Sequence, residues 1–163
     1  MTSSARLRSW RSSERRARSS ERAGAVTVRV ALVAPDGEIW SGMARMVIAK
    51  TLDGDLGILT GHPPVIGILA DGSLVRILDV EDGPAESQQE VRAAVSSGFL
   101  SVTDDRVSIL VRQAELGFQV EVAAARARLD SALSEAGQLP SGEQETLEVR
   151  YSRALLRAAG DQS

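Results

Sequence analysis

The sequence contains no cysteine and a single histidine, His62, among its 163 residues. Without cysteine the chain can form no disulfide, no thiolate metal site and no thiol nucleophile. One histidine argues against a zinc site, and the Gly-x-Ser-x-Gly motif that would accompany a Ser-His-Asp triad is absent. We therefore expect no metal site and no cofactor.

Aromatic residues and long hydrophobic runs are also scarce. Aromatic residues make up 3% of the chain, so aliphatic side chains must build the core. The same scarcity argues against a base-stacking surface for nucleic acid. The apolar runs fall far short of the roughly 18 residues that a membrane-spanning helix needs, so we expect a soluble or peripheral protein.

Positive charge is concentrated at one end of the sequence. Residues 1–24 contain seven arginines and two glutamates, whereas residues 25–163 carry a formal charge of −8. An acidic body disfavours nucleic-acid binding, because neutralising phosphates requires a basic face. Residues 1–24 are rich in arginine and serine without apolar periodicity. We expect them to form a disordered tail, either dispensable or used for targeting or for an anionic surface.

Residues 25–112 have the pattern of a β-domain. From Val26 to Leu32 every second residue is apolar, which is the period of a strand with one buried face. Turn signals then recur at short intervals, at Asp36-Gly37, Asp53-Gly54, Asp71-Gly72, Asp82-Gly83-Pro84 and Asp104-Asp105. This pattern indicates about eight or nine short strands in a sandwich or barrel ending near Arg112. We favour an antiparallel β-sandwich.

After Gln113 the apolar period changes to that of a helix. One apolar stripe covers residues 122–136, and Gly137 stands where such a helix should end. Residues 141–144 have capping-box spacing for the start of a second helix, and a second apolar stripe covers residues 147–158. Residues 113–163 are therefore expected to form an antiparallel helical hairpin after the sandwich, which makes the fold class α+β.

The hairpin has two features that bear on its role. Alanine dominates its apolar stripes, so the hairpin should be only marginally stable alone and must pack on the sandwich or on a partner. Arg150, Arg153 and Arg157 project together from the second helix. They form either a solvated face or a docking surface for acidic groups.

The stretch GDLGILTGHPP, residues 54–64, gathers glycines, prolines and the histidine. It lacks the Gly-Lys-Ser/Thr ending of a P-loop, and its two prolines prevent a helix from following, so a phosphate-binding role is disfavoured. Four residues are expected to set a stiff loop geometry: Gly54, Gly57, Gly61 and Pro63. His62, with Asp55 as the nearby acid, is then either a contact residue or a catalytic group.

Several stretches together resemble the epsilon subunit of F-type ATP synthase. They are VRVALVAPDGEIWSG at 28–42, GDLGILTGHPPVIGILADG at 54–72, SSGFLSVTDDRVSILV at 96–111 and AEL at 114–116. They occur in the order and spacing of that family and cover nearly all of the chain from Val26 onward. Residues 1–24 lie outside the resemblance.

The resemblance implies a non-catalytic rotor subunit in the central stalk of the proton-translocating synthase. Its partners would be the gamma subunit, the membrane ring of c subunits and the alpha and beta catalytic subunits, at the cytoplasmic face of the cell membrane. Asp55 and His62 match the family's loop residues at the ring. The hairpin would lie beside the sandwich or extend into the catalytic head, where Arg150, Arg153 and Arg157 would contact acidic surfaces and restrain ATP hydrolysis.

One stretch departs from the family pattern. Some relatives bind ATP through a motif similar to Ile-Asp-x-x-Arg-Ala, but residues 120–125 here read VEVAAA, with Ala124 in place of the arginine. We therefore expect weak or absent nucleotide binding. The alternative function from a different class is a small sandwich hydrolase or ligand-binding module that uses His62 and Asp55.

Overall fold

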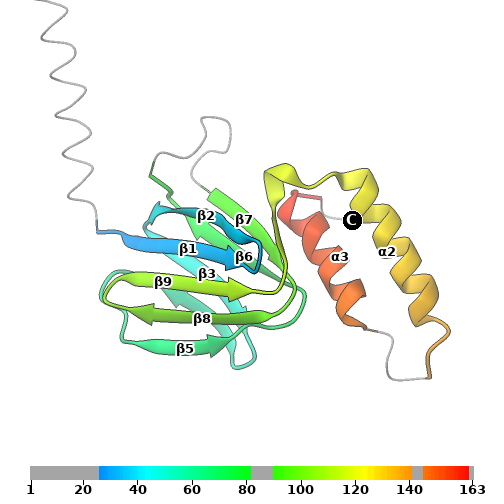
Figure 1. Ribbon diagram of the computed structural model, residues 1–163, viewed down its shortest axis with the longest axis horizontal. Helices are drawn as coiled ribbons and strands as arrows, with labels where there is room; N and C mark the ends of the chain where they lie inside the picture. The colour runs from blue at the N-terminus through cyan, green and yellow to red at the C-terminus, as the bar shows by residue number, and fades with distance from the viewer. Residues whose placement is uncertain (1–25, 82–89, 141–144, 162–163) are drawn as a thin grey trace, which may run out of the picture.

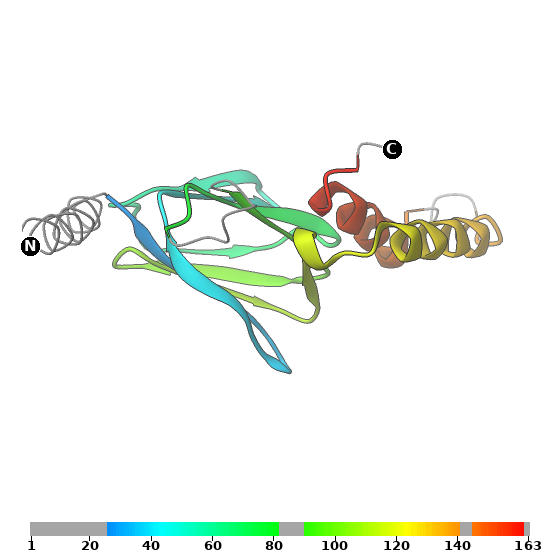
Figure 2. The same cartoon turned by 90° about the horizontal axis from the view of Figure 1, so that it is seen from above.

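The computed structural model describes residues 26–81, 90–140 and 145–161. Within these ranges the chain forms two five-stranded sheets followed by a short 3-10 helix and two α-helices (Figure 1). Seen from above, the two sheets form separate layers and the helices lie beyond one end of them (Figure 2). The expected α+β fold, a β-sandwich followed by a helical hairpin, is confirmed.

The first sheet has a mixed topology. Its spatial order is β2 (Gly37–Ala44), β1 (Val28–Ala34), β9 (Arg106–Val111), β8 (Gly98–Thr103) and β5 (Val65–Ile68). Neighbouring strands are antiparallel except β1 and β9, which pair in parallel. The sheet is therefore not purely antiparallel as expected, because sequence periodicity defines the faces of a strand but not its partners.

The second sheet is antiparallel throughout. Its spatial order is β10 (Ala114–Leu116), β7 (Glu90–Val95), β6 (Ser73–Leu78), β3 (Met46–Thr51) and β4 (Gly54–Ile58). The short edge strand β10 extends the sandwich beyond Arg112, and the side chain of Leu116 is buried in the core. Ten strands among the described residues thus replace the expected eight or nine.

The core lies between the two sheets and is aliphatic. Alternate residues of each strand point inward, as Val28, Val30 and Leu32 do on β1, and all three are fully buried. Four of the expected turn signals lie between strands, whereas Asp82-Gly83-Pro84 lies outside the described residues. The period-two pattern therefore predicted the buried face correctly from Val28 onward. At Val26 the prediction is wrong, because this residue precedes β1 and is 66% exposed.

The hairpin consists of α2 (Val122–Ala136) and α3 (Leu147–Ala158). Helix α2 ends before Gly137, as expected, and Gly137 has helical dihedral angles with φ −64°. Helix α3 begins later than the capping-box pattern at 141–144 suggested, and that pattern lies outside the described residues. Its actual N-cap is Thr146, whose hydroxyl accepts a hydrogen bond from the amide of Val149.

The hairpin packs on the second sheet rather than standing apart. Tyr151, Ala154 and Leu155 of α3 are buried in one cluster with Ala94 of β7, and Leu74 of β6 packs against it. On its other side the same cluster includes Ala125 of α2. The structure therefore contains the docked arrangement, in which α3 lies between the sandwich and α2 (Figure 1).

Two glycines allow α3 to approach the sandwich closely. A Cβ atom at Gly117, in the 3-10 helix η1 (Gly117–Gln119), would lie 2.0 Å from the carbonyl oxygen of Ala158. A Cβ atom at Gly72 would lie 2.5 Å from Cβ of Arg150. Real Cβ atoms do not approach other atoms this closely, so the docked position of α3 depends on both glycines.

Candidate functional site

The GDLGILTGHPP stretch connects the two layers of the sandwich. Residues 54–58 form the edge strand β4 of the second sheet, and the chain then crosses to β5, the edge strand of the first sheet. Gly54 and Gly61 have φ angles of 119° and 79°, which few other residues adopt. At Gly57 an added Cβ would meet only the flexible end of Met46.

Hydrogen bonds define the turn around His62. The backbone amide of His62 donates to the carbonyl oxygen of Leu59 at 3.1 Å, and its ring Nδ1 donates to the carbonyl oxygen of Pro63 at 2.7 Å. The backbone amide of Gly61 donates to a carboxylate oxygen of Asp105, in the turn between β8 and β9, at 2.6 Å. The partner of the ring Nδ1 is thus a carbonyl group and not the acid that a catalytic dyad would need.

Asp55 lies at the other end of the sandwich. It pairs in register with Lys50 near the β3–β4 turn and lines a cavity together with Asp71. The end of the sandwich at Asp71 and the end at Asp105 are separated by the length of β8, which is about 17 Å at ~3.3 Å per residue. The structure therefore does not bring Asp55 and His62 together into one catalytic site.

The outer face of the first sheet carries a row of exposed apolar side chains. Ile68 of β5 pairs with Phe99 of β8, which pairs with Leu110 of β9. These three side chains are 59%, 44% and 40% exposed, and Ile66 on the same face of β5 is 75% exposed. We call these four residues the apolar row. Adjacent apolar residues such as Phe99 and Leu100 on β8 were the sequence signal for it, because they make both faces of a strand apolar.

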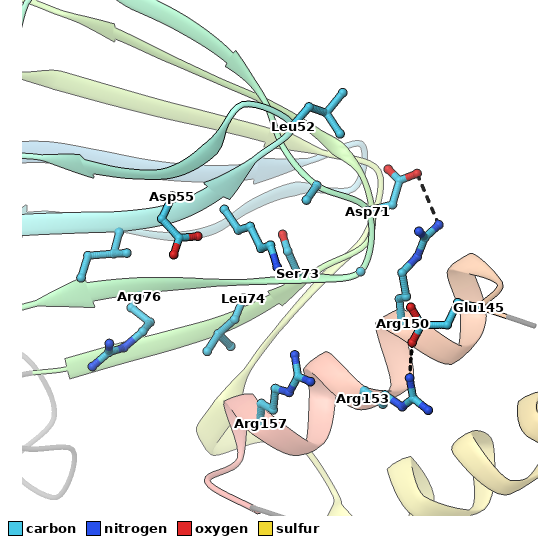
Figure 3. Close-up of a pocket in the computed structure, with 14 residues that line it drawn as sticks. Leu52, Asp55, Asp71, Ser73, Leu74, Arg76, Glu145, Arg150, Arg153 and Arg157 are labelled. Carbon is cyan, nitrogen blue, oxygen red and sulfur yellow. Dashed lines mark hydrogen bonds and ion pairs between the residues drawn. The ribbon is translucent and has the colours of Figure 1, made fainter.

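The three hairpin arginines face a cavity between α3 and the second sheet. The cavity has a volume of about 590 Å³ and is lined by Arg150, Arg153 and Arg157 together with Asp71 and other side chains of the sandwich (Figure 3). Arg150 lies 4.0 Å from the carboxylate of Asp71, and Arg153 pairs with Glu145. In the docked arrangement, two of the arginines therefore already contact acids of the same chain.

A fourth arginine at this cavity, Arg76, is paired with an acid of the same sheet. Its Nε donates to a carboxylate oxygen of Glu90 at 2.6 Å, and Arg92 donates to the same oxygen at 3.1 Å. The hydrogen bond from Arg76 lowers the pKa of Glu90 below its usual value. The carboxylate therefore stays ionised and holds both guanidinium groups on the outer face of the second sheet.

Tyr151 is the central buried side chain of the docking contact. It is 1% exposed, and its hydroxyl has no hydrogen-bond partner among the described residues. The guanidinium of Arg128 on α2 lies 5.5 Å from the ring centroid, a cation–π distance. Burial, with a smaller effect from the charge of Glu115, raises the pKa of Tyr151 to about 12.

This pKa predicts that alkaline pH weakens docking. The folded-state pKa of Tyr151 exceeds the unfolded value of about 10. The free energy of unfolding of the docked arrangement is therefore unaffected below pH 10, and it falls by up to about 3 kcal/mol as the pH rises toward 12. Tyr151 is the single tyrosine, so near-ultraviolet tyrosinate absorbance reports its titration directly. The Tyr151→Phe variant should be as stable at neutral pH and lose this part of the alkaline destabilisation. Titration of Tyr151 with an ordinary pKa would contradict the prediction.

No helix in the described part of the chain is long and apolar enough to cross a bilayer.

Comparison with known families gives a match to the β-sandwich domain of the ATP synthase delta/epsilon chain over residues 27–117. The match includes β10 and the start of η1, in agreement with the extent of the sandwich in the structure.

Curated relatives carry the same description. The chain is 50% identical over 131 residues to the ATP synthase epsilon chain of Thermobifida fusca. The alignment covers 80% of this chain and 90% of that one. It is 48% identical over 89 residues to the epsilon chain of Frankia casuarinae, covering 55% of this chain and 96% of that one. For the epsilon chain of Streptomyces coelicolor the identity is 40% over 111 residues, covering 68% and 84%.

A solved structure shares the fold. A chain in the Euglena gracilis mitochondrial ATP synthase structure of OSCP, F1 and c-ring superposes with a TM-score of 0.61 at 20% identity. The superposition covers 83% of this chain and 82% of that chain, so it includes helices as well as the sandwich.

Proposed function

This chain belongs to the ATP synthase epsilon family, whose members are non-catalytic subunits, and we propose that it couples proton flow to ATP synthesis as part of the central stalk. In this role the sandwich holds the gamma subunit and the ring of c subunits, and the hairpin restrains ATP hydrolysis in the catalytic head. The protein would then be peripheral to the membrane, at the cytoplasmic face.

The observation that carries the proposal is the apolar row on the first sheet. Ile66, Ile68, Phe99 and Leu110 form a contiguous surface on a face that the hairpin does not cover. Exposed apolar surface of this kind is typical of a protein interface. In a stalk subunit the partner for such a surface is the gamma subunit.

Asp55 and His62 remain the proposed contacts to the c ring. They lie toward opposite ends of the sandwich, so a shared partner surface would have to run along the side formed by the edge strands β4 and β5. The positive φ angles of Gly54 and Gly61 set the bends of that side, and Pro63 fixes a φ angle beside His62, which would help it to transmit torque. Gly57 has no such role, because its neighbour is only the flexible end of Met46.

The docked hairpin suits a regulatory role. Arg150 contacts Asp71 of the sandwich, so it could meet acidic groups of the alpha and beta subunits only after α3 leaves the sandwich. The partner of Arg153, Glu145, lies just before α3 and would move with the helix. The docking contact is rich in alanine, and such a contact can separate at a cost of a few kcal/mol. The docked arrangement would thus be the state that does not restrain hydrolysis.

Purification of the complex from membranes tests the proposal directly. The full chain, tagged at its C-terminus, should recover gamma and c subunits in constant ratio after mild detergent extraction. Reproducible recovery of the chain without gamma, from membranes whose synthase remains assembled, would contradict it. The hydrolase alternative predicts instead an intrinsic activity lost on His62→Ala, and the geometry around His62 gives no support for one.

Removing the hairpin should raise ATP hydrolysis by the complex. The deletion should cover residues 118–163, because Leu116 of β10 belongs to the sandwich core and must be kept. Loss of the restraining element then increases hydrolysis severalfold while the truncated chain still assembles. Unchanged hydrolysis in a complex that contains the truncated chain would show that this hairpin does not restrain the enzyme.

A further inference from the structure

We propose that Asp105 is a positioning residue, whose carboxylate fixes the loop of residues 59–64 and with it the direction of His62. The inference rests on the proposed function only where it concerns the ring contact. The geometric part stands on the hydrogen bond from the Gly61 amide to the Asp105 carboxylate at 2.6 Å. This bond joins two segments that are 44 residues apart in the sequence.

The backbone of Asp105 is unusual for a residue with a side chain. Thr103 and Arg106 pair directly, so Asp104 and Asp105 alone form the turn between β8 and β9. Their φ angles are 49° and 57°, both in the left-handed region, as in a type I′ turn. Glycine adopts this conformation without strain, and aspartate does so less readily. The turn alone would therefore favour glycine at position 105, and what aspartate adds there is the bond to Gly61.

Asp105 is itself held in place from the other side. Its backbone carbonyl oxygen accepts a hydrogen bond from the amide of Arg29, next to the start of β1, at 2.8 Å. The residue thus connects β1, the β8–β9 turn and the loop. A carboxylate held by β1 and by the β8–β9 turn can in turn hold the Gly61 amide, and so fixes one choice for a glycine that could adopt several backbone conformations.

The position of Gly61 determines where His62 points. His62 follows it directly, and the His62 amide and ring are bound only to loop atoms, those of Leu59 and Pro63, among the contacts of the described residues. Without the Asp105 bond the loop could therefore move as a unit, and the imidazole with it.

Three variants of the full chain separate the carboxylate from the turn. Asp105→Gly removes the acceptor and relaxes the turn, Asp104→Gly relaxes the same turn and leaves the acceptor, and Asp105→Asn retains an oxygen acceptor and the left-handed preference. We expect hydrogen exchange at the Gly61 amide, measured by NMR, to become roughly tenfold to a hundredfold faster in Asp105→Gly, as for loss of a hydrogen bond to a charged group. Exchange should stay near wild type in Asp104→Gly and rise less in Asp105→Asn than in Asp105→Gly, because asparagine keeps an acceptor without the charge.

The exchange rates of the Gly61 amide test the positioning role of Asp105 separately from the ring contact. Equal exchange at Gly61 in Asp105→Gly and Asp104→Gly would overturn the positioning role. If exchange rises in Asp105→Gly and stays near wild type in Asp104→Gly, the role is established, and proton-driven ATP synthesis by the reconstituted complex then tests the ring contact. Lower synthesis with Asp105→Gly than with Asp104→Gly supports a contact at His62. Equal synthesis would reject the contact and leave the positioning role intact.

Discussion

Gly117→Ala is expected to release the hairpin from the sandwich while the sandwich remains folded. The new methyl group would lie 2.0 Å from the carbonyl oxygen of Ala158 and 2.7 Å from its carbonyl carbon, and these are backbone atoms in the last turn of α3. Backbone atoms cannot rotate out of the way as a side chain can. Overpacking of this kind costs about 3 kcal/mol, which shifts the docking equilibrium by roughly a hundredfold.

Hydrogen exchange measured across the whole chain tests this expectation. Amides of α3 should lose protection in Gly117→Ala, whereas amides of β9 should keep theirs and serve as an internal reference for the sandwich. Gly137→Ala is the matched control, because its φ of −64° suits alanine and its nearest neighbour would be 3.5 Å away. If α3 is equally protected in both variants, the glycine contact does not control docking.

The same variant makes a prediction about the complex that deletion alone cannot make. Deleting the hairpin should raise ATP hydrolysis, since the restraining element is gone. Gly117→Ala should lower hydrolysis, because it keeps the hairpin and disfavours only its docked position. Opposite signs from two changes that both remove docking would identify the hairpin itself, and not the uncovered sandwich, as the restraint.

The division of the fold into sandwich and hairpin followed from periodicity, because strand and helix periods are local properties of the chain. Val28, Val30 and Leu32 were predicted to be inward, and they are fully buried. The parallel pairing of β1 with β9 could not be predicted in the same way, because it joins segments more than 70 residues apart and depends on how the layers close.

In the candidate site, too, local features could be predicted from the sequence and long-range contacts could not. Gly54 and Gly61 were expected to set the geometry of this stretch, and their positive φ angles are a local property of glycine. The separation of Asp55 from His62 depends on which strands form the edges of the two sheets, and the bond between Gly61 and Asp105 depends on how two distant turns meet. Asp55 and His62 are close in the sequence, which suggested one site. In the structure they lie toward opposite ends of the sandwich.

Phe99→Asp is expected to weaken association with the gamma subunit by about thirtyfold or more. Phe99 lies in the middle of the apolar row, between Ile68 and Leu110, and central aromatic residues contribute most to the binding energy of an interface. A carboxylate there would be buried without a partner when the subunits associate, which adds a desolvation cost to the lost apolar contact. Loss of about 2 kcal/mol corresponds to the thirtyfold change.

The matched control lies on the same strand and the same face. Thr103→Asp adds the same charge on β8 four residues after Phe99. Thr103 lies outside the apolar row and pairs with Arg106. Both substitutions are at exposed positions, so each isolated chain should keep its thermal stability. Titration of gamma against the variants measures the effect. Equal affinities for gamma in Phe99→Asp and Thr103→Asp would show that gamma binds elsewhere. A loss of affinity confined to Phe99→Asp would place the contact on the apolar row, because the two variants carry the same added charge on the same fold.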